Sequence, residues 1–158
     1  MVTGIDGAPE VSTPHPESRG GSVRMNHLAV AVTDLDEALA FYRDALGLTV
    51  EHVEDVPTES VRVAFLPLRD GEIELMQPTR DDTGVARWLA KRGNGMHHVC
   101  LQVFDIAGTL ARLKDHGVEL INPEPVRKHD GTLYAFIRPR SAFGVLIELY
   151  ELTSGGDS

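Results

Sequence analysis

The hydrophobic positions of this chain change period along its length, from the pattern of a strand to the spacing of a helix and back. The segment NHLAVAV, residues 26–32, is short and apolar, as β-strands are. Apolar side chains then recur every three or four residues from Leu35 to Leu46, which predicts a helix. Asp34 can cap this helix and Gly47 can end it. Strand-like segments follow near residues 48–54, 61–67 and 72–77, so the first half predicts the order βαβββ.

The second half repeats this pattern, displaced by 71 residues. At this offset His27 falls on His98, and after a short insertion Glu74 falls on Glu148. The repeat predicts a helix over 105–116 and strands near 97–103, 118–121, 132–138 and 145–151. The chain therefore predicts an α+β fold of two tandem βαβββ modules, at about 25–78 and 96–151, joined by a helical linker at 79–95.

The ends of the chain differ from the middle in composition. Residues 1–24 are crowded with Gly, Pro, Ser and Thr and have no apolar period, and residues 152–158 are similar. We expect both ends to be flexible tails. With 158 residues, of which 42% are hydrophobic, the remaining segment suits one globular domain.

Strand alternation places the repeated polar residues on particular faces. His27 faces away from the side chains expected to pack on the helix, and His98 shares a face with Cys100, whereas His97 should face the other way. If the modules pair about a pseudo-twofold axis, two histidines and two carboxylates (Glu74 and Glu148) converge at the seam. Two imidazoles and two carboxylates suit a divalent first-row metal with open positions for water or substrate. A lone strand histidine is more often a core residue, but the repetition in both halves favours a metal site.

Composition and charge narrow the partners. Cys100 is the single cysteine, so an intrachain disulfide and a cysteine metal cluster are both excluded. The net charge of −9 disfavours nucleic acid, which is bound by clustered cations, and favours a small molecule. The chain has neither an apolar run of the roughly 18 residues that cross a bilayer nor the apolar core of a signal peptide. We therefore expect a cytoplasmic protein without a membrane partner.

The tandem pattern with His27, Glu74, His98 and Glu148 resembles the vicinal oxygen chelate superfamily, whose paired modules form a curved mixed sheet around a metal site. More narrowly, the segments VRVAFLPLRDGEIELMQP, VARWLAKRGNGMHHV and GVLIELYE are similar to those of the methylmalonyl-CoA epimerases. The resemblance covers about residues 25–151. It implies that these four residues bind a divalent metal, with Co, Mn, Ni, Fe and Zn all compatible, and that the protein is a homodimer.

The resemblance also implies a reaction. An acyl-CoA epimerase removes the α-proton of a thioester on one face and delivers a proton on the other, through an enolate that the metal stabilises. Glu74 and Glu148 are then candidates for a dual role as ligand and as acid or base. Some relatives carry a second carboxylate at the position of Val63, so in this chain another residue must take that role.

A basic segment is the candidate for contact with the CoA phosphates. Within residues 127–140 it contains four cations: Arg127, Lys128, Arg138 and Arg140. Strand parity places Arg138 and Arg140 on the same face. A solvated hairpin is the alternative interpretation of this segment, since charged turns are common.

Two other functions remain open at this stage. A glyoxalase I-type lyase uses the same four ligand types for a related enediolate reaction on a glutathione-derived substrate, and other metal-dependent superfamily members share the site. A non-catalytic binder of the bleomycin-resistance type is the third possibility, but such proteins generally lack the complete metal set.

Overall fold

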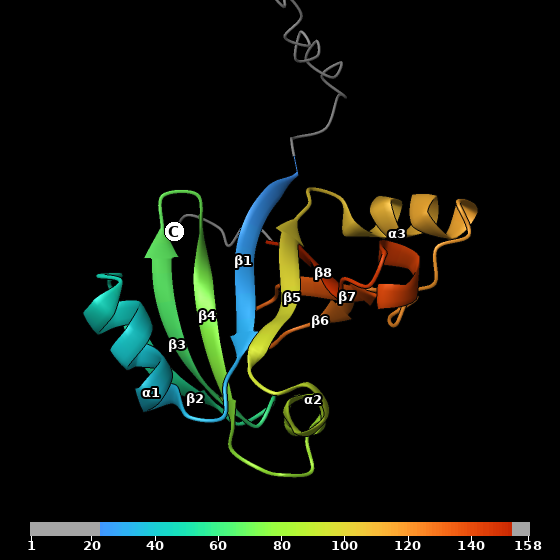
Figure 1. Ribbon diagram of the computed structural model, residues 1–158. Helices are drawn as coiled ribbons and strands as arrows, with labels where there is room; N and C mark the ends of the chain where they lie inside the picture. The colour runs from blue at the N-terminus through green and yellow to red at the C-terminus, as the bar shows by residue number, and fades with distance from the viewer. Residues whose placement is uncertain (1–22, 153–158) are drawn as a thin grey trace, which may run out of the picture.

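Strands β1 (Arg24–Ala31) and β5 (Gly95–Gln102) lie side by side and run antiparallel in the middle of one eight-stranded sheet (Figure 1). The computed structural model describes residues 23–152. The strand order is β2-β3-β4-β1-β5-β8-β7-β6, so the two predicted modules are arranged symmetrically about the β1–β5 pair. The predicted α+β fold with a curved mixed sheet is confirmed. The expected tails lie largely outside the described residues.

Each module adds three strands and one main helix to its central strand. In the first module, β1 pairs in parallel with β4, which pairs antiparallel with β3; in the second, β5 pairs in parallel with β8, which pairs antiparallel with β7. The remaining strands of the first module are β2 (His52–Val56), β3 (Val61–Leu68) and β4 (Gly71–Pro78). Those of the second are β6 (Val126–Arg127), β7 (Leu133–Ile137) and β8 (Ile147–Glu151).

The helices begin where the sequence places a capping aspartate. Helix α1 (Leu35–Leu39) continues into the π-helical turn η1 (Ala40–Ala45), and α3 (Ile106–Asp115) occupies the matching place in the second module. The Asp34 side chain accepts a hydrogen bond from the Glu37 amide at 3.0 Å, which satisfies a donor that the helix leaves free. The linker contains α2 (Gly84–Arg92), and the 3₁₀ helix η2 (Pro139–Ala142) precedes β8.

Two hydrophobic cores fix the helices to one face of the sheet. The core of the first module joins α1 to strands β1, β3 and β4, and the core of the second joins α3 to β7 and β8. The buried members are Val32, Leu35, Leu39, Ala64, Leu66 and Leu75 in the first, and Val103, Ile106, Leu110, Ala135, Ile137 and Leu149 in the second. The strand positions in these cores are those that alternate with His27 and His98. The histidines therefore face the opposite side of their strands, away from α1 and α3.

The predicted strand at 118–121 is wrong. Leu120 makes a single bridge to Ile137, and the short strand β6 forms the edge of the sheet instead. Pro123 and Pro125 lie between these two places, and proline cannot donate a ladder hydrogen bond. The first-module strand predicted from residue 48 likewise begins later, at His52.

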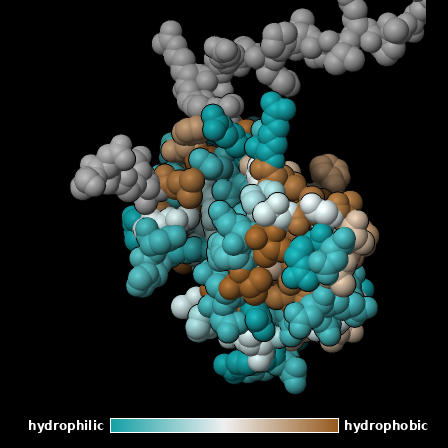
Figure 2. Space-filling view, turned by 90° about the vertical axis from the view of Figure 1, so that its left-hand side faces the viewer, coloured by the Kyte–Doolittle hydropathy of each residue, from teal (hydrophilic) through white to brown (hydrophobic). Residues whose placement is uncertain are grey.

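The outer side of the first helix carries apolar side chains. Phe41 and Leu46, on and directly after η1, are 56% and 55% exposed. Figure 2 views the molecule from this side and shows hydrophobic side chains gathered in the middle of the face, among hydrophilic ones. No helix within residues 23–152 is both long enough and apolar enough to span a membrane.

Strand β3 offers a test of how much the first core stabilises the fold. Leu66 is fully buried, whereas Leu68, two residues later, is 44% exposed. We expect Leu66→Ala to lower the free energy of unfolding by about 2–5 kcal/mol, because it removes buried methyl groups and leaves a cavity. Leu68→Ala should cost less than about 1 kcal/mol. Urea denaturation followed by circular dichroism measures both, and equal losses would contradict the placement of this core.

Candidate active site

The pairing of β1 with β5 brings the two predicted histidines into contact. Ala29 lies opposite His98 and His27 lies opposite Cys100, so both imidazoles project from the same face of neighbouring strands. The Nε2 atoms of His27 and His98 are 3.0 Å apart. Both residues are buried, with 2% and 6% of their surfaces exposed. The repeat in the sequence therefore corresponds to a physical pair.

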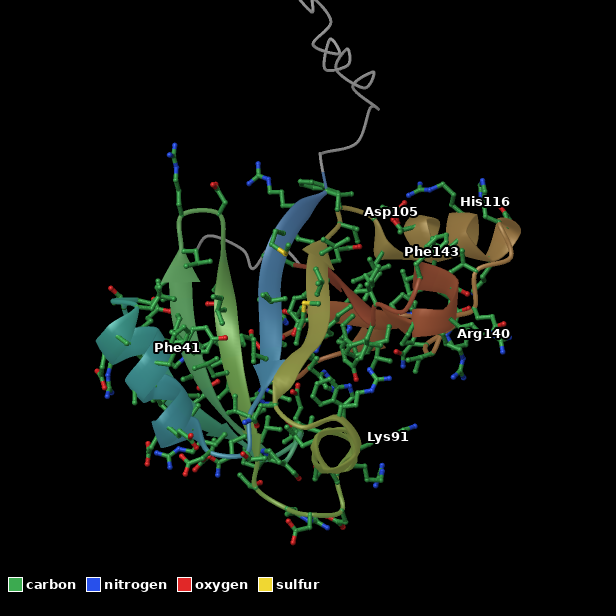
Figure 3. All side chains as sticks on the ribbon, in the orientation of Figure 1. Phe41, Lys91, Asp105, His116, Arg140 and Phe143 are labelled. Atoms are coloured by element: carbon green, nitrogen blue, oxygen red, sulfur yellow. The ribbon has the colours of Figure 1, made fainter. Side chains whose placement is uncertain are left out.

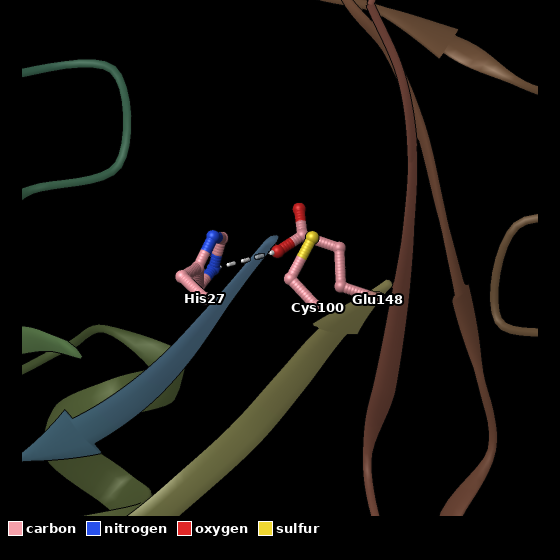
Figure 4. Close-up of side chains that lie close together, drawn as sticks. All are labelled: His27, Cys100 and Glu148. Carbon is pink, nitrogen blue, oxygen red and sulfur yellow. Dashed lines mark ion pairs between the residues drawn. The ribbon is translucent and has the colours of Figure 1, made fainter. Parts of the chain in front are cut away.

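Glu148 joins this pair from β8. One oxygen, Oε2, lies 3.0 Å from Nε2 of His98 and 3.5 Å from Nε2 of His27. Figure 4 shows the Glu148 carboxylate directed at His27, with the Cys100 side chain beside it. Glu148 is 4% exposed, so this charge is held in a largely dry environment. Three donor atoms, from His27, His98 and Glu148, thus lie around one point.

Glu74 lies on the other side of the His27 ring. Its Oε1 is 3.4 Å from Nδ1 of His27, whereas the Nε2 edge faces His98 and Glu148. Glu72, two residues earlier on β4, belongs to the same group of donor atoms, which lie within 4.8 Å of one another. The structure thus brings the four predicted ligands together, but the carboxylate of Glu74 stands beside the common point of the other three.

The hydrogen bonds of the two histidines favour a cation between them. Nδ1 of His27 contacts Oδ1 of Asn26 at 2.8 Å, and Nδ1 of His98 contacts Nδ1 of His97 at 2.9 Å. If each Nδ1 of the pair donates its proton, both Nε2 atoms present lone pairs to each other, which is unfavourable without a positive charge. Metal bonds of about 2.1 Å at right angles place neighbouring donor atoms about 3.0 Å apart, as these are. The residues present therefore fit a divalent metal.

Cys100 does not change this donor set. It is fully buried, and burial, reinforced by the carboxylates of Glu148 and Glu74, raises the pKa of its thiol. Without a metal the thiol therefore stays protonated, and the loss of this proton would oppose binding of an ion to sulfur, because a metal-binding cysteine is a thiolate. Nitrogen and oxygen donors remain, and these suit the Co, Mn, Ni, Fe and Zn ions that the ligand types allow.

The two carboxylates of the site have opposite pKa shifts. Burial, together with the nearby charges of Glu72 and Glu148, raises the pKa of Glu74 to about 8. Burial opposes ionisation of Glu148 as well, but the adjacent imidazoles of His27 and His98 outweigh it and lower the pKa of Glu148 to about 2. Near neutral pH the metal-free site therefore contains one carboxylic acid and one carboxylate.

His97 is placed differently from its prediction. Strand parity assigned it to the face opposite His98, but a bulge lies here, because Ala29 pairs with His98 while Val30 pairs with Met96. The extra residue lets the two neighbouring imidazoles form a hydrogen bond. Burial and then the charge of His98 lower the pKa of His97 to about 4, so its ring is neutral and can accept a hydrogen bond from His98.

Three of the four predicted phosphate contacts, Arg127, Arg138 and Arg140, are exposed side chains. Arg138 and Arg140 do not follow strand parity, because the chain turns into η2 at Pro139, and Arg140 forms an ion pair with Glu119. Figure 3 shows Arg140 at the end of the molecule that carries η2, away from β1. Arg127 is exposed and donates to the Gly131 carbonyl of its own loop at 3.0 Å. The prediction of a shared face for Arg138 and Arg140 is wrong.

Lys128, the fourth of these cations, lies close to the site. Its ammonium donates a hydrogen bond to the hydroxyl of Tyr150, and the Tyr150 ring lies edge-on to the His27 ring with centroids 5.7 Å apart. The sequence analysis did not identify Tyr150 as a site residue, although residues 148 and 150 alternate onto the same face of β8. Val63, at the place of a second carboxylate in some relatives, is 3% exposed and packs with Ala29 and other apolar residues.

A cavity of about 130 Å³ adjoins the histidine pair. His97 and His98 form part of its wall, together with Trp88 and Arg92 of α2. The guanidinium of Arg92 lies 5.7 Å from the centre of the Trp88 ring. Arg92 is thus a cation beside the site that sequence reasoning did not single out, since it reads as an ordinary basic residue in the last turn of a helix.

Comparison with known proteins agrees with this fold. A profile of the Glyoxalase/Bleomycin resistance protein/Dioxygenase superfamily matches residues 26–136. The mitochondrial methylmalonyl-CoA epimerase of Mus musculus is 38% identical over 127 residues, which cover 80% of this chain and 71% of that protein. The ethylmalonyl-CoA/methylmalonyl-CoA epimerase of Cereibacter sphaeroides is 37% identical over 131 residues, which cover 82% of this chain and 98% of that protein.

A solved structure of methylmalonyl-CoA epimerase in complex with methylmalonyl-CoA and NH4+ superposes with a TM-score of 0.75 at 33% identity, covering 86% of this chain and 99% of that one. A more distant relative, a probable lactoylglutathione lyase of Synechocystis sp., is 30% identical over 132 residues, which cover 83% of this chain and 97% of that protein. The chain belongs to the glyoxalase/bleomycin resistance/dioxygenase superfamily, as the resemblance predicted. Within that superfamily it is a methylmalonyl-CoA epimerase-like isomerase.

The two adjacent histidines should respond differently to substitution. We expect His98→Ala to abolish binding of Co or Mn, because it removes a donor atom from the common point. His97→Ala should weaken binding by about 10–100-fold, because it removes only the partner that orients the His98 ring. Calorimetric titration of metal-free protein measures both. Equal loss in the two variants, or loss confined to His97→Ala, would contradict this arrangement.

The affinity for metal should depend on pH through Glu74. Because the pKa of Glu74 is about 8 without metal, its carboxyl carries a proton at pH 6–7 that a nearby divalent ion displaces. We expect affinity to rise by roughly tenfold per pH unit between pH 6 and 8 and then to level off. Titrations in buffers of different ionisation enthalpy count the released proton. Glu74→Gln should lose this proton release, and an unchanged count would contradict the assignment.

Proposed function

We propose that this protein is a metal-dependent epimerase of methylmalonyl-CoA or a related 2-substituted malonyl-CoA. The similarity to the methylmalonyl-CoA epimerase of Mus musculus and the ethylmalonyl-CoA/methylmalonyl-CoA epimerase of Cereibacter sphaeroides supports the substrate class. The histidine pair, with its facing Nε2 atoms, supports the metal requirement. A divalent ion bound there would act as a Lewis acid on the thioester and lower the cost of forming the enolate.

The observation that carries the proposal is the pair of carboxyl groups that the two modules place on either side of the His27 ring. Glu74 comes from β4 of the first module and Glu148 from β8 of the second, at equivalent places in the repeat. Without metal, their pKa values of about 8 and about 2 leave Glu74 protonated and Glu148 ionised near neutral pH. Epimerisation at one carbon needs this combination, because a base must act on one face and an acid on the other.

The proton transfers can be written with these two groups. The Glu148 carboxylate takes the α-proton as the C–H bond breaks and its electron pair enters the enolate. Glu74, which regains a proton once the substrate has taken its place beside the ion, gives that proton to the same carbon from the opposite face, and a new C–H bond forms with inverted configuration. Glu148 is then protonated and Glu74 ionised, which is the arrangement required for reaction in the reverse direction.

Val63 supports the assignment of Glu74 as the second acid or base. The side chain at this position is apolar and packs with Ala29, Val61 and Met76, so it has no proton to exchange. Glu74 shares with this cluster the side of the sheet opposite α1, and its carboxylate stands beside the common point of the other donors rather than at it. That position leaves Glu74 available for proton transfer.

The lyase alternative is tested with the same protein. Metal-loaded enzyme is incubated with a single enantiomer of methylmalonyl-CoA, and the enantiomers are followed by a stereospecific coupled assay. In parallel it is given the hemithioacetal of methylglyoxal and glutathione. We expect interconversion of the CoA thioester and no turnover of the hemithioacetal. The opposite result would assign the site to lyase chemistry, and the absence of both would refute the proposal.

Single substitutions should separate the two half-reactions. In Glu74→Gln, the enantiomer whose α-hydrogen faces Glu148 should still exchange that hydrogen for deuterium in D₂O, while its conversion falls by about 10²–10⁴-fold. In Glu148→Gln, the other enantiomer should show the same behaviour. Mass spectrometry and the coupled assay measure exchange and inversion separately. Loss of exchange for both enantiomers in either variant would contradict the two-group mechanism.

A further inference from the structure

Lys128 turns inward from the loop that joins β6 and β7. Its side chain is 27% exposed, and its ammonium lies over the rings of Tyr150 and Tyr134, at 4.7 Å and 5.4 Å from their centres. The ammonium also donates a hydrogen bond to the Tyr150 hydroxyl. A lysine held against two aromatic rings is largely desolvated, so an anion that reaches it is attracted more strongly than at an open surface.

Tyr150 connects this charge to the proposed site. It shares a face of β8 with Glu148, and its ring meets the ring of His27 edge-on, at 5.7 Å between centroids. Burial would lower the pKa of Lys128, but the hydrogen bond to Tyr150 and the charges of Glu59 and Glu148 raise it overall. The same ammonium counteracts the raised pKa of Glu74. The cation therefore stays charged and acts on carboxylates of both modules.

The other partner of Lys128 comes from the opposite edge of the sheet. Glu59 lies in the turn between β2 and β3, and its Oε1 is 3.3 Å from the ammonium. Strands β2 and β6 are the two ends of the strand order, so this ion pair spans the open side of the curved sheet. Glu59 is half exposed, and ion pairs of this kind contribute little free energy. A substrate anion can therefore displace it.

The position of Lys128 determines which anionic group of an acyl-CoA it can bind. The thioester carbonyl of an acyl-CoA is separated from the nucleotide phosphates by the long pantetheine arm. Only the Tyr150 side chain separates the Lys128 ammonium from His27, so this cation lies near the acyl group. The phosphates lie much farther out. The free carboxylate of a 2-carboxyacyl group is the anion next to the reacting carbon.

We propose, on the basis of the proposed function, that Lys128 determines substrate specificity by binding the free carboxylate of the acyl group. Glu59 pairs with the Lys128 ammonium until the substrate carboxylate displaces it. The role differs from acid–base catalysis, because an ammonium that keeps its proton has no lone pair with which to remove an α-hydrogen. It also differs from the phosphate contact expected from the sequence. A carboxylate requirement would exclude acyl-CoA molecules that lack the second acid group.

Equilibrium binding to metal-loaded protein tests this role without relying on turnover. Calorimetric titrations compare methylmalonyl-CoA with propionyl-CoA, which lacks the carboxylate. We expect Lys128→Met to weaken binding of methylmalonyl-CoA by about 10–100-fold, the size of a charge-assisted hydrogen bond, and to change binding of propionyl-CoA by less than about 2-fold. Glu59→Gln should tighten binding of methylmalonyl-CoA by about 2–5-fold, because it removes the competing carboxylate.

The ion pair between Lys114 and Glu124 supplies matched controls. It joins α3 to the loop after it, at 2.8 Å and with 41% and 80% of the side chains exposed. Lys114→Met and Glu124→Gln change the net charge equally and should leave both affinities within about 2-fold. Thermal melting checks that Lys128→Met is folded, and Lys128→Arg, which keeps the charge, should retain most of the preference for methylmalonyl-CoA.

The outcomes separate a failure of the proposed role of Lys128 from a failure of the proposed epimerase function. Equal weakening of both thioesters in Lys128→Met would overturn the carboxylate assignment and favour a phosphate contact. An unchanged affinity for methylmalonyl-CoA would also overturn the carboxylate assignment. Weaker binding in Glu59→Gln would overturn the displacement of Glu59. If the wild-type protein binds and epimerises methylmalonyl-CoA, these failures concern Lys128 alone. If it binds neither thioester, the proposed function fails and the role of Lys128 with it.

Discussion

The antiparallel pairing of β1 with β5 is the contact on which the site depends. Each strand contributes one histidine, and the register that places Ala29 opposite His98 brings the two Nε2 atoms to 3.0 Å. A slip of one residue would turn one imidazole into a hydrophobic core, since strand side chains alternate between faces. The parallel partners β4 and β8 then add Glu74 and Glu148 in corresponding places. Neither module contains the complete site.

Burying these four polar groups is unfavourable, and the two hydrophobic cores offset that cost from the other face of the sheet. Desolvation raises the pKa of both carboxyl groups, and their neighbours separate the two values, because Glu148 lies against both histidines and Glu74 lies beside another acid. An approximately symmetric fold thus produces two chemically different carboxyl groups. That difference is what a reaction on two faces of one carbon needs.

Much of this arrangement follows from the sequence because it depends on local periodicity and on a repeat. The offset between His27 and His98 predicts the two modules, and alternation predicts which faces meet. The errors arise where a non-local or irregular feature interrupts the period: a bulge at His97, and the turn into a 3₁₀ helix at Pro139. The inward orientation of Lys128 depends on Tyr150, 22 residues away, so no local pattern could predict it.

The central claim is that the paired strands create one metal centre shared by both modules. The most direct measurement is the anomalous difference density of a crystal of this protein loaded with cobalt. The account predicts one strong peak about 2.0–2.2 Å from Nε2 of His27, Nε2 of His98 and a Glu148 oxygen. A peak among His27, Glu72 and Glu74 without His98, or no peak near the β1–β5 pair, would contradict it.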